Sequence, residues 1–302
     1  MTDGAGPPDG GLLAVHAHPD DETLSTGALL ATWARAGRAV TVVTCTRGER
    51  GEVIGRRLAR LSGDPDALAA HRAGELAGAL EALGVSDHVT LDEVAGDGPW
   101  VDSGMVWADV GRAAIPQDAP QAAFARVDLD LAADRLARLV CDRRPSVVVT
   151  YEPDGGYGHP DHVHAHAVTM RAVQLAAERG WQVPCVLWAA LDADQLVSGR
   201  EWCARTARPG LVAAVGRPLP SAAVAPAEVA VRVAVAPVLE RVLGAMRAHA
   251  TQVQAVEALE GEGCLGCYAL SDAVVQPVPA QECYRVGSQN GPVGWPDGVR
   301  VR

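Results

Sequence analysis

The sequence predicts an α/β protein whose sheet is mostly parallel and covered by helices on both faces. Two kinds of segment, which alternate along the chain, predict this fold. Short runs rich in valine and threonine alternate with longer segments whose apolar residues recur at helical spacing. Such alternation is typical of parallel strands joined by crossover helices. We therefore expect a Rossmann-like domain, and a weaker pattern later in the chain predicts a smaller carboxy-terminal lobe.

The elements follow in order from these patterns. Strands are predicted at 12–16, 39–46, 88–91 and 146–151. Helices are predicted at 22–36, 67–83, 128–143 and 161–179. Gly37 and Gly84 end the first two helices, as glycine commonly does. Segment 92–126 lacks periodicity, so we expect a long loop on the substrate side of the domain.

The rest of the chain carries weaker signals. It predicts strands at 185–188 and 229–235 and a helix at 237–254. We expect residues 1–183 to form the catalytic domain and residues 184–302 to form a smaller lobe that completes the active-site cleft.

Composition excludes several classes of function. The chain has 302 residues, 48% of them hydrophobic, which is enough for a large core. Its net charge of -11 argues against nucleic acid as a partner, because nonspecific binding to phosphates needs clustered cations. All 26 cationic residues are arginine, which excludes sites that need a lysine, such as a Walker-type phosphate loop or a Schiff base.

No targeting signal is apparent in the sequence. Residues 1–11 carry no basic segment, and no run approaches the roughly 20 apolar residues that span a bilayer. We therefore expect a cytoplasmic protein with no membrane partner. The seven scattered cysteines predict free thiols in a reducing compartment. The sequence does not predict an oligomeric partner.

Six of the nine histidines fall into two clusters. One cluster, His16 and His18, follows strand 12–16, and the other lies within 159–166, after strand 146–151. Because the carboxyl ends of parallel strands meet at one edge of a sheet, we expect the two clusters to converge in one crevice.

Each cluster contains a His-Pro-Asp motif, at residues 18–20 and 159–161. Two imidazoles and a carboxylate form the ligand set of a catalytic zinc site with an open position for water. The adjacent Asp20 and Asp21 suggest one metal ligand and one base. Helix capping is the structural alternative, since Asp and Pro also favour helix starts. Two such motifs at equivalent strand ends favour the metal site.

Weaker motifs are interpreted structurally. Three isolated histidines are expected to be structural: His71, His88 and His249. We expect no direct role for His166, although it lies one helical turn from His162. A glycine pattern beginning at Gly261 matches a dinucleotide fingerprint but follows a predicted helix, so we interpret it as a false match. Cys264 and Cys267 are expected to be free thiols.

In combination, these motifs resemble those of the zinc-dependent deacetylases of the N-acetylglucosaminyl-phosphatidylinositol de-N-acetylase superfamily, also described as LmbE-like. The resemblance covers residues 12–36, 42–55, the helix around Arg72, 102–105, 147–166 and 248–253. It implies one zinc ion per subunit, bound by His18, Asp21 and His162. Ferrous iron accepts the same ligand set.

The resemblance also implies the roles of the remaining site residues. Asp20 would be the general base, and His159 would stabilise the oxyanion. Asp161 would orient His159 and keep it protonated, while Tyr157 would approach the substrate carbonyl. Four further residues would bind the sugar: Ser25, Arg72, Asp102 and Met105.

Within the superfamily, the resemblance is closest to the deacetylases of mycothiol biosynthesis. It implies a small pseudodisaccharide of N-acetylglucosamine and inositol as the substrate. Amidases of mycothiol conjugates are the nearest alternative, but they have a lysine where this chain has Ser25 and a proline where it has Gly158. More distant alternatives are a two-histidine, one-carboxylate iron oxygenase and a structural or merely sugar-binding zinc protein.

Overall fold

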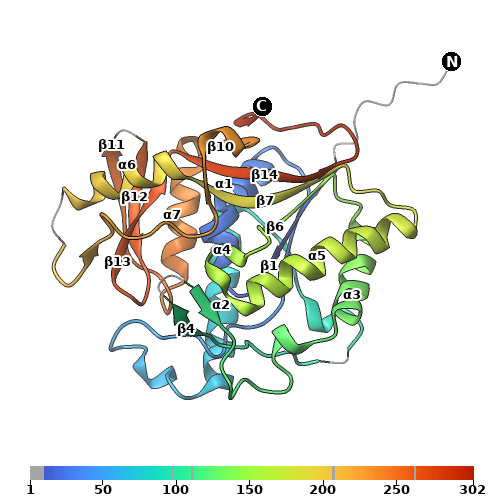
Figure 1. Cartoon of the computed structure of the whole chain (residues 1–302), viewed down its shortest axis with the longest axis horizontal. Helices are drawn as coiled ribbons and strands as arrows, with labels where there is room; N and C mark the ends of the chain where they lie inside the picture. The colour runs from blue at the N-terminus through green and yellow to red at the C-terminus, as the bar shows by residue number, and fades with distance from the viewer. Residues whose placement is uncertain (1–9, 97, 110–111, 206–207, 262) are drawn as a thin grey trace.

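The computed structural model describes residues 10–96, 98–109, 112–205, 208–261 and 263–302, and Figure 1 shows their arrangement. The strand order in the main sheet is β15-β10-β14-β7-β6-β1-β2-β3, and β9 (Ala223–Val224) pairs with β7 outside this path. Adjacent strands run parallel in one part of it: β1 (Leu12–His16), β2 (Val40–Thr44), β3 (Asp87–Thr90), β6 (Val147–Tyr151) and β7 (Cys185–Asp192). The predicted α/β fold is confirmed.

The chain beyond residue 184 enters this sheet as well. Three antiparallel strands extend it from β7: β14 (Gln281–Gln289), β10 (Val231–Ala234) and β15 (Val299–Val301). A second, smaller sheet consists of β11 (Gln254–Gly261), β12 (Cys264–Ala269), β13 (Val274–Pro279) and β8 (Val212–Ala213). Helix α6 (Ala193–Ala204) lies against β13 of this small sheet. The division into two units at residue 184 stays a prediction.

Helices cover both faces of the main sheet because successive side chains of a strand point to opposite faces. One group is α1 (Asp21–Arg35), α2 (Pro65–Leu83) and α7 (Leu239–Ala248), and the other is α3 (Leu129–Arg143) and α5 (Pro160–Glu178) (Figure 1). Leu12 and Ala14 of β1 belong to the core shared with the first group, and Leu13 and Val15 to the core shared with the second. Replacing a fully buried core leucine such as Leu29 by alanine would cost about 2–5 kcal/mol.

Two predictions after residue 90 need correction. The predicted helix 237–254 ends at Ala248, because residues 249–253 turn back onto the loop after β1, and β11 begins at Gln254. The predicted long loop 92–126 contains a hairpin of β4 (Val106–Asp109) and β5 (Arg112–Ala114). Positions 97, 110 and 111 of that loop lie outside the described residues.

No helix in the described ranges is both long enough and apolar enough to cross a membrane.

Candidate metal centre and active site

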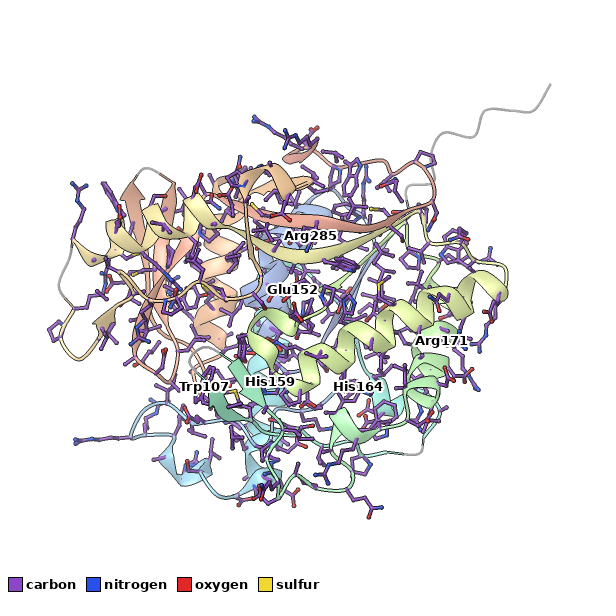
Figure 2. The ribbon with its side chains drawn as sticks, viewed as in Figure 1. Trp107, Glu152, His159, His164, Arg171 and Arg285 are labelled. Carbon is purple, nitrogen blue, oxygen red and sulfur yellow. The ribbon has the colours of Figure 1, made fainter. Side chains whose placement is uncertain are left out.

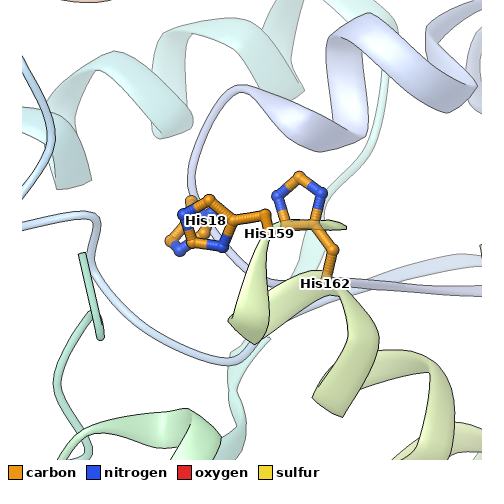
Figure 3. Close-up of side chains that lie close together, drawn as sticks. All are labelled: His18, His159 and His162. Carbon is orange, nitrogen blue, oxygen red and sulfur yellow. The ribbon is translucent and has the colours of Figure 1, made fainter. Parts of the chain in front are cut away.

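The two histidine clusters converge because their strands are neighbours. β1 and β6 pair in parallel, with Leu12 opposite Val147, so their carboxyl ends meet at one edge of the sheet. Ligand atoms of His18, His159 and His162 lie within 4.8 Å of one another, and all three residues are buried. Figure 3 shows the three imidazole rings gathered where α5 begins. The prediction that the two histidine clusters meet at one edge of the sheet is therefore confirmed.

Asp21 lies at the spacing of a shared metal ligand from both His18 and His162. The Asp21 Oδ2 atom lies 3.2 Å from His18 Nδ1 and 3.3 Å from His162 Nε2. A zinc ion with ligands at about 2.0–2.1 Å holds tetrahedral donor atoms about 3.3–3.4 Å apart. The donor set and its spacing therefore fit a divalent metal with an open coordination position.

Both imidazoles are fixed in the tautomer that this role requires. The Nδ1 atom of His162 lies 3.1 Å from the Gly155 carbonyl oxygen, so it donates there and leaves Nε2 for a metal. The Nε2 atom of His18 lies 3.1 Å from Asp161 Oδ2, which leaves Nδ1 for a metal. A carboxylate or carbonyl behind a histidine is the usual support of a metal ligand.

Asp161 therefore acts on His18 in this structure. Its carboxylate also accepts hydrogen bonds from the Ser103 backbone N–H at 2.9 Å, the Ser103 hydroxyl at 2.5 Å and the Ala125 N–H at 3.1 Å. Among the described residues, no hydrogen bond joins this carboxylate to the His159 ring. The expectation that Asp161 orients His159 through its side chain is not supported.

His159 is instead held as a neutral imidazole. Burial and the neighbouring rings of His18 and His162 lower the pKa of His159 to about 3. Its Nδ1 accepts a hydrogen bond from the Asp161 backbone N–H at 3.2 Å, so the ring proton is on Nε2. Asp161 raises the pKa of His159, in the direction expected, but burial and the two histidines outweigh it. Protonation of His159 by Asp161 during the reaction stays a prediction, and the Nε2–H is a hydrogen-bond donor.

The charge balance of the pocket favours a cation. The carboxylates of Asp21, Asp102 and Asp161 face His18. Burial alone would lower the pKa of His18, but these carboxylates outweigh it and raise the pKa. Burial alone would raise the pKa of Asp21, but His162 and His18 outweigh it and lower the pKa. A divalent ion would neutralise this excess of negative charge.

Asp20 lies beside the ligand set in a strained conformation. Its φ of 111° is unusual for a residue other than glycine, and such strain often occurs at functional sites. Burial and the adjacent Asp21 carboxylate raise the pKa of Asp20. No hydrogen bond from the described residues engages the Asp20 carboxylate. A free carboxylate at this position fits a proton acceptor.

Tyr157 lies over the same pocket on the short helix α4 (Gly155–Gly158). Its ring is 5.3 Å from that of His162 and 5.9 Å from that of His159, between centroids. Glu152, labelled in Figure 2, fixes this turn by accepting hydrogen bonds from Asp154 and Gly156 N–H groups, both at 2.7 Å. Glu152 also accepts a hydrogen bond from the Ser221 hydroxyl at 2.8 Å. Sequence patterns do not indicate Glu152, since its partners are backbone groups and a serine 69 residues later in the chain.

The predicted sugar-binding residues have different surroundings. Arg72 is 2% exposed, and its guanidinium donates to the carbonyls of Gly48 and Glu52 and to the Thr251 hydroxyl. A β-carbon at Gly51 would collide with that guanidinium, so glycine lets the loop close over it. Arg72 thus holds this loop in place, and direct contact with a sugar stays a prediction.

Of the other three residues predicted to bind the sugar, Asp102 lies next to a metal ligand, and Ser25 and Met105 are more exposed than Arg72. Asp102 is buried, accepts hydrogen bonds from the N–H groups of Arg50 and Gly104, and lies 3.6 Å from His18 Nε2. Ser25 and Met105 are partly exposed. Their contacts with a substrate stay predictions.

Tyr151 is a site residue that the sequence analysis missed. Its ring stacks on His162 with 4.2 Å between centroids and 10° between planes. Its hydroxyl accepts a hydrogen bond from the Ala17 N–H at 2.8 Å and donates one to the Asp21 carboxylate. The position at the end of strand 146–151 was the available signal, because strand ends form the ligand-binding edge.

A buried ion pair supports the start of α1. His249 Nε2 lies 2.8 Å from Glu22 Oε1, and both side chains are fully buried. Gln252 donates to the Pro19 carbonyl at 2.8 Å. The turn after α7 thus holds the loop that carries Asp20 and Asp21. This pair fits the structural role expected of His249, and that role stays a prediction.

The remaining motifs stay outside the site. Cys264 and Cys267 are buried free thiols in β12, as predicted. The glycine pattern that begins at Gly261 falls in the β11–β12 hairpin, so it does not form a strand-to-helix phosphate turn.

Comparison with known proteins gives three findings. The family model described as PIG-L, GlcNAc-PI de-N-acetylase, matches residues 13–173. The chain is 47% identical over 294 residues to the 1D-myo-inositol 2-acetamido-2-deoxy-alpha-D-glucopyranoside deacetylase of Kineococcus radiotolerans, covering 93% of this chain and 79% of that protein. It is 45% identical over 297 residues to the protein of the same name from Nocardia farcinica, covering 96% and 94%.

A solved structure shows the same fold in another enzyme. The 4-carboxy-2-hydroxymuconate hydratase GalB from Pseudomonas putida aligns with 95% of this chain and 99% of its own, at a TM-score of 0.54 and 18% identity. This likeness concerns the fold alone.

Proposed function

This chain belongs to the GlcNAc-PI de-N-acetylase family, and on that basis we propose that it removes the N-acetyl group of 1D-myo-inositol 2-acetamido-2-deoxy-alpha-D-glucopyranoside. The products are glucosaminyl-inositol and acetate, in a step of mycothiol biosynthesis. The observation that carries the proposal is the Asp21 carboxylate, 3.2 Å from His18 Nδ1 and 3.3 Å from His162 Nε2, next to the free carboxylate of Asp20. The names of the relatives support the choice of substrate.

We assign one zinc ion to His18, Asp21 and His162, since the donor atoms, their tautomers and the surrounding negative charge all fit it. When bound, zinc supplies a Lewis acid that acidifies water and polarises the amide carbonyl. Ferrous iron fits the same donors, and metal analysis of the purified protein distinguishes the two. Family membership removes the support for an iron oxygenase.

Asp20 moves the protons of the reaction in this proposal. Its carboxylate accepts the proton of the attacking water, and the raised pKa of Asp20 suits that acceptance near neutral pH. The same group then delivers the proton to the departing amine, which must be protonated to leave. Asp20 precedes α1 at a φ of 111°, and its carboxylate makes no capping hydrogen bond to the helix, so it is free for this role.

His159 and Tyr157 act on the carbonyl oxygen. His159 is neutral and carries its proton on Nε2, so it stabilises the developing oxyanion as a hydrogen-bond donor rather than as a cation. Tyr157 contributes its hydroxyl from α4, where Glu152 holds the turn. Burial raises the pKa of Tyr157, which keeps the hydroxyl protonated and able to donate.

The sugar lies next to Ser25, Asp102 and Met105 in this proposal. Asp102 is already fixed by backbone N–H groups, which preorganises its carboxylate for hydroxyls. Arg72 acts indirectly by holding residues 48–52.

The test is acetate release from the N-acetylglucosaminyl-inositol by zinc-loaded protein. Asp20→Asn keeps the size of the side chain and tolerates the positive φ, so we expect activity to fall by about 10²–10⁴-fold without unfolding. Asp66→Asn, an exposed aspartate on α2, is the matched control and should retain activity.

A mycothiol conjugate is assayed in parallel. Faster cleavage of the conjugate would move the protein to the amidase alternative. Turnover of neither substrate would leave the metal centre in place and refute the assigned substrate.

A further inference from the structure

Trp107 on β4 is an exposed tryptophan beside the active site. Its side chain is 61% exposed, more than any other large apolar side chain of the described residues. Figure 2 shows it on the same side of the molecule as His159. Exposing so large an apolar ring to water is unfavourable, and exposed aromatic groups at a pocket mouth commonly contact ligands.

Trp107 is linked to the site through one intervening ring. Its ring centroid lies 6.0 Å from that of Tyr157, with 39° between the planes. The Tyr157 ring lies 5.3 Å from the ring of the metal ligand His162. Tyr157 therefore lies between Trp107 and a metal ligand in a chain of ring contacts.

The segment that precedes Trp107 is tied to the same centre. Ser103 donates two hydrogen bonds to Asp161, and Asp102 accepts one from the Gly104 N–H at 2.7 Å. The strand itself pairs with β5, where Trp107 lies opposite Ala113. Residues 102–104 before β4 and the pairing with β5 thus hold Trp107 in a defined place beside Tyr157.

We propose that Trp107 is a stacking platform for the inositol ring, the ring of the substrate that carries no acetamide. This inference rests on the proposed function. The glucosamine ring carries the acetamide and must lie next to His162 and Asp20, so the attached ring extends outward, toward Trp107. The C–H groups on one face of a cyclitol pack against an indole, while its hydroxyls remain in water.

The test compares two substrates, the pseudodisaccharide and free N-acetylglucosamine, on the zinc-loaded full chain. We expect Trp107→Ala to raise the KM for the pseudodisaccharide about tenfold with little change in kcat, because the platform contributes binding and not chemistry. Turnover of free N-acetylglucosamine should change by less than about twofold, because that molecule lacks the second ring. Trp107→Phe should restore most of the affinity. Val106→Ala, an exposed change on the same strand, is the matched control for damage to the hairpin.

An equal loss with both substrates, or no change with the pseudodisaccharide, would overturn the inference. A second readout keeps it distinct from the proposed function. Glucosaminyl-inositol should change the tryptophan fluorescence of the wild-type protein, and this change should disappear in Trp107→Phe. If the wild-type protein released acetate from neither substrate, the proposed function would fail. The fluorescence difference would then still support or refute the platform.

Discussion

The Asp161 carboxylate connects three separate segments of the site. It accepts hydrogen bonds from Ser103 and Ala125 and lies 3.1 Å from His18 Nε2. One side chain thus orients a metal ligand and fixes the segment that leads to the β4–β5 hairpin. Its role is to position other groups, since its partners leave it no lone pair aimed at a substrate.

We expect Asp161→Asn to weaken zinc binding about 10- to 100-fold, because an amide supports the His18 imidazole less well than a carboxylate does. Competition with a chromophoric chelator measures the affinity. Asp130→Asn, which changes an exposed partner of Arg171, is the control and should bind zinc normally. Unchanged affinity in Asp161→Asn would contradict the positioning role.

Tyr151→Phe should lower the free energy of unfolding by about 1–3 kcal/mol, because the buried Ala17 N–H would lose its acceptor. Urea unfolding of the metal-free protein measures it. Tyr268→Phe is the matched control, since the Tyr268 hydroxyl has no hydrogen-bond partner in the described part of the chain. A similar loss in both variants would show that the Ala17 contact is not the cause.

The elements of the parallel sheet could be predicted because each is a short, nearly continuous apolar run. β1, β2 and β6 are buried along their whole length, so their sequences are rich in leucine, valine and threonine and show no alternation with charged residues. The helix 237–254 was predicted too long because its second half is set by distant partners. His249 pairs with Glu22, and local periodicity does not report such a contact.

The metal ligands could be predicted from the sequence because they follow short apolar strands. The groups that hold these ligands in place could not be predicted. His18, Asp21 and His162 follow strands that pair with each other, so topology alone brings them together. The partner of Asp161 depends on where a loop 58 residues earlier folds back, and the protonation of His159 depends on the resulting burial. No short motif reports the partner of Asp161 or the protonation state of His159.

Asp192 joins two elements and makes their packing depend on pH. It caps α6 and lies 2.7 Å from the Arg232 guanidinium on β10. Burial alone would raise the pKa of Asp192, but Arg232 and the Gln195 N–H outweigh it and lower the pKa. Because the folded-state pKa is lower than the unfolded value of about 3.9, this contribution is present above that pH and is lost as the pH falls through the folded-state pKa.

We therefore expect Asp192→Asn to be about 1 kcal/mol less stable than the wild type at pH 7, since asparagine still caps the helix but lacks the charge. The difference should shrink below about pH 4. Urea unfolding at several pH values measures it, with the exposed Asp194→Asn as the control. A difference that does not vary with pH would rule out the ionic contribution.

In the whole molecule, the metal centre lies at the rim of the second core, which it touches through Tyr151. The ligands lie at the carboxyl edge of the sheet, whereas the two cores lie between the sheet and the helices on either face. Loss of the metal should therefore remove activity and leave the fold.

Treatment with a chelator is expected to abolish acetate release while circular dichroism stays unchanged at 25 °C. The free energy of unfolding should fall only by the amount that linkage to one bound ion allows, about 3–4 kcal/mol relative to zinc concentrations 100–1,000 times Kd. Added zinc should restore activity. Unfolding on chelation would instead assign the ion a structural role.

The place of β14 has a consequence for synthesis. Residues 281–289 lie between β7 and β10, so residues 185–190 of β7 lack their antiparallel partner β14 until this late segment has left the ribosome. An unpaired apolar edge is a template for pairing with other chains. Nascent chains that contain the parallel strands but lack β14 should therefore be the species most prone to aggregate and most dependent on chaperones.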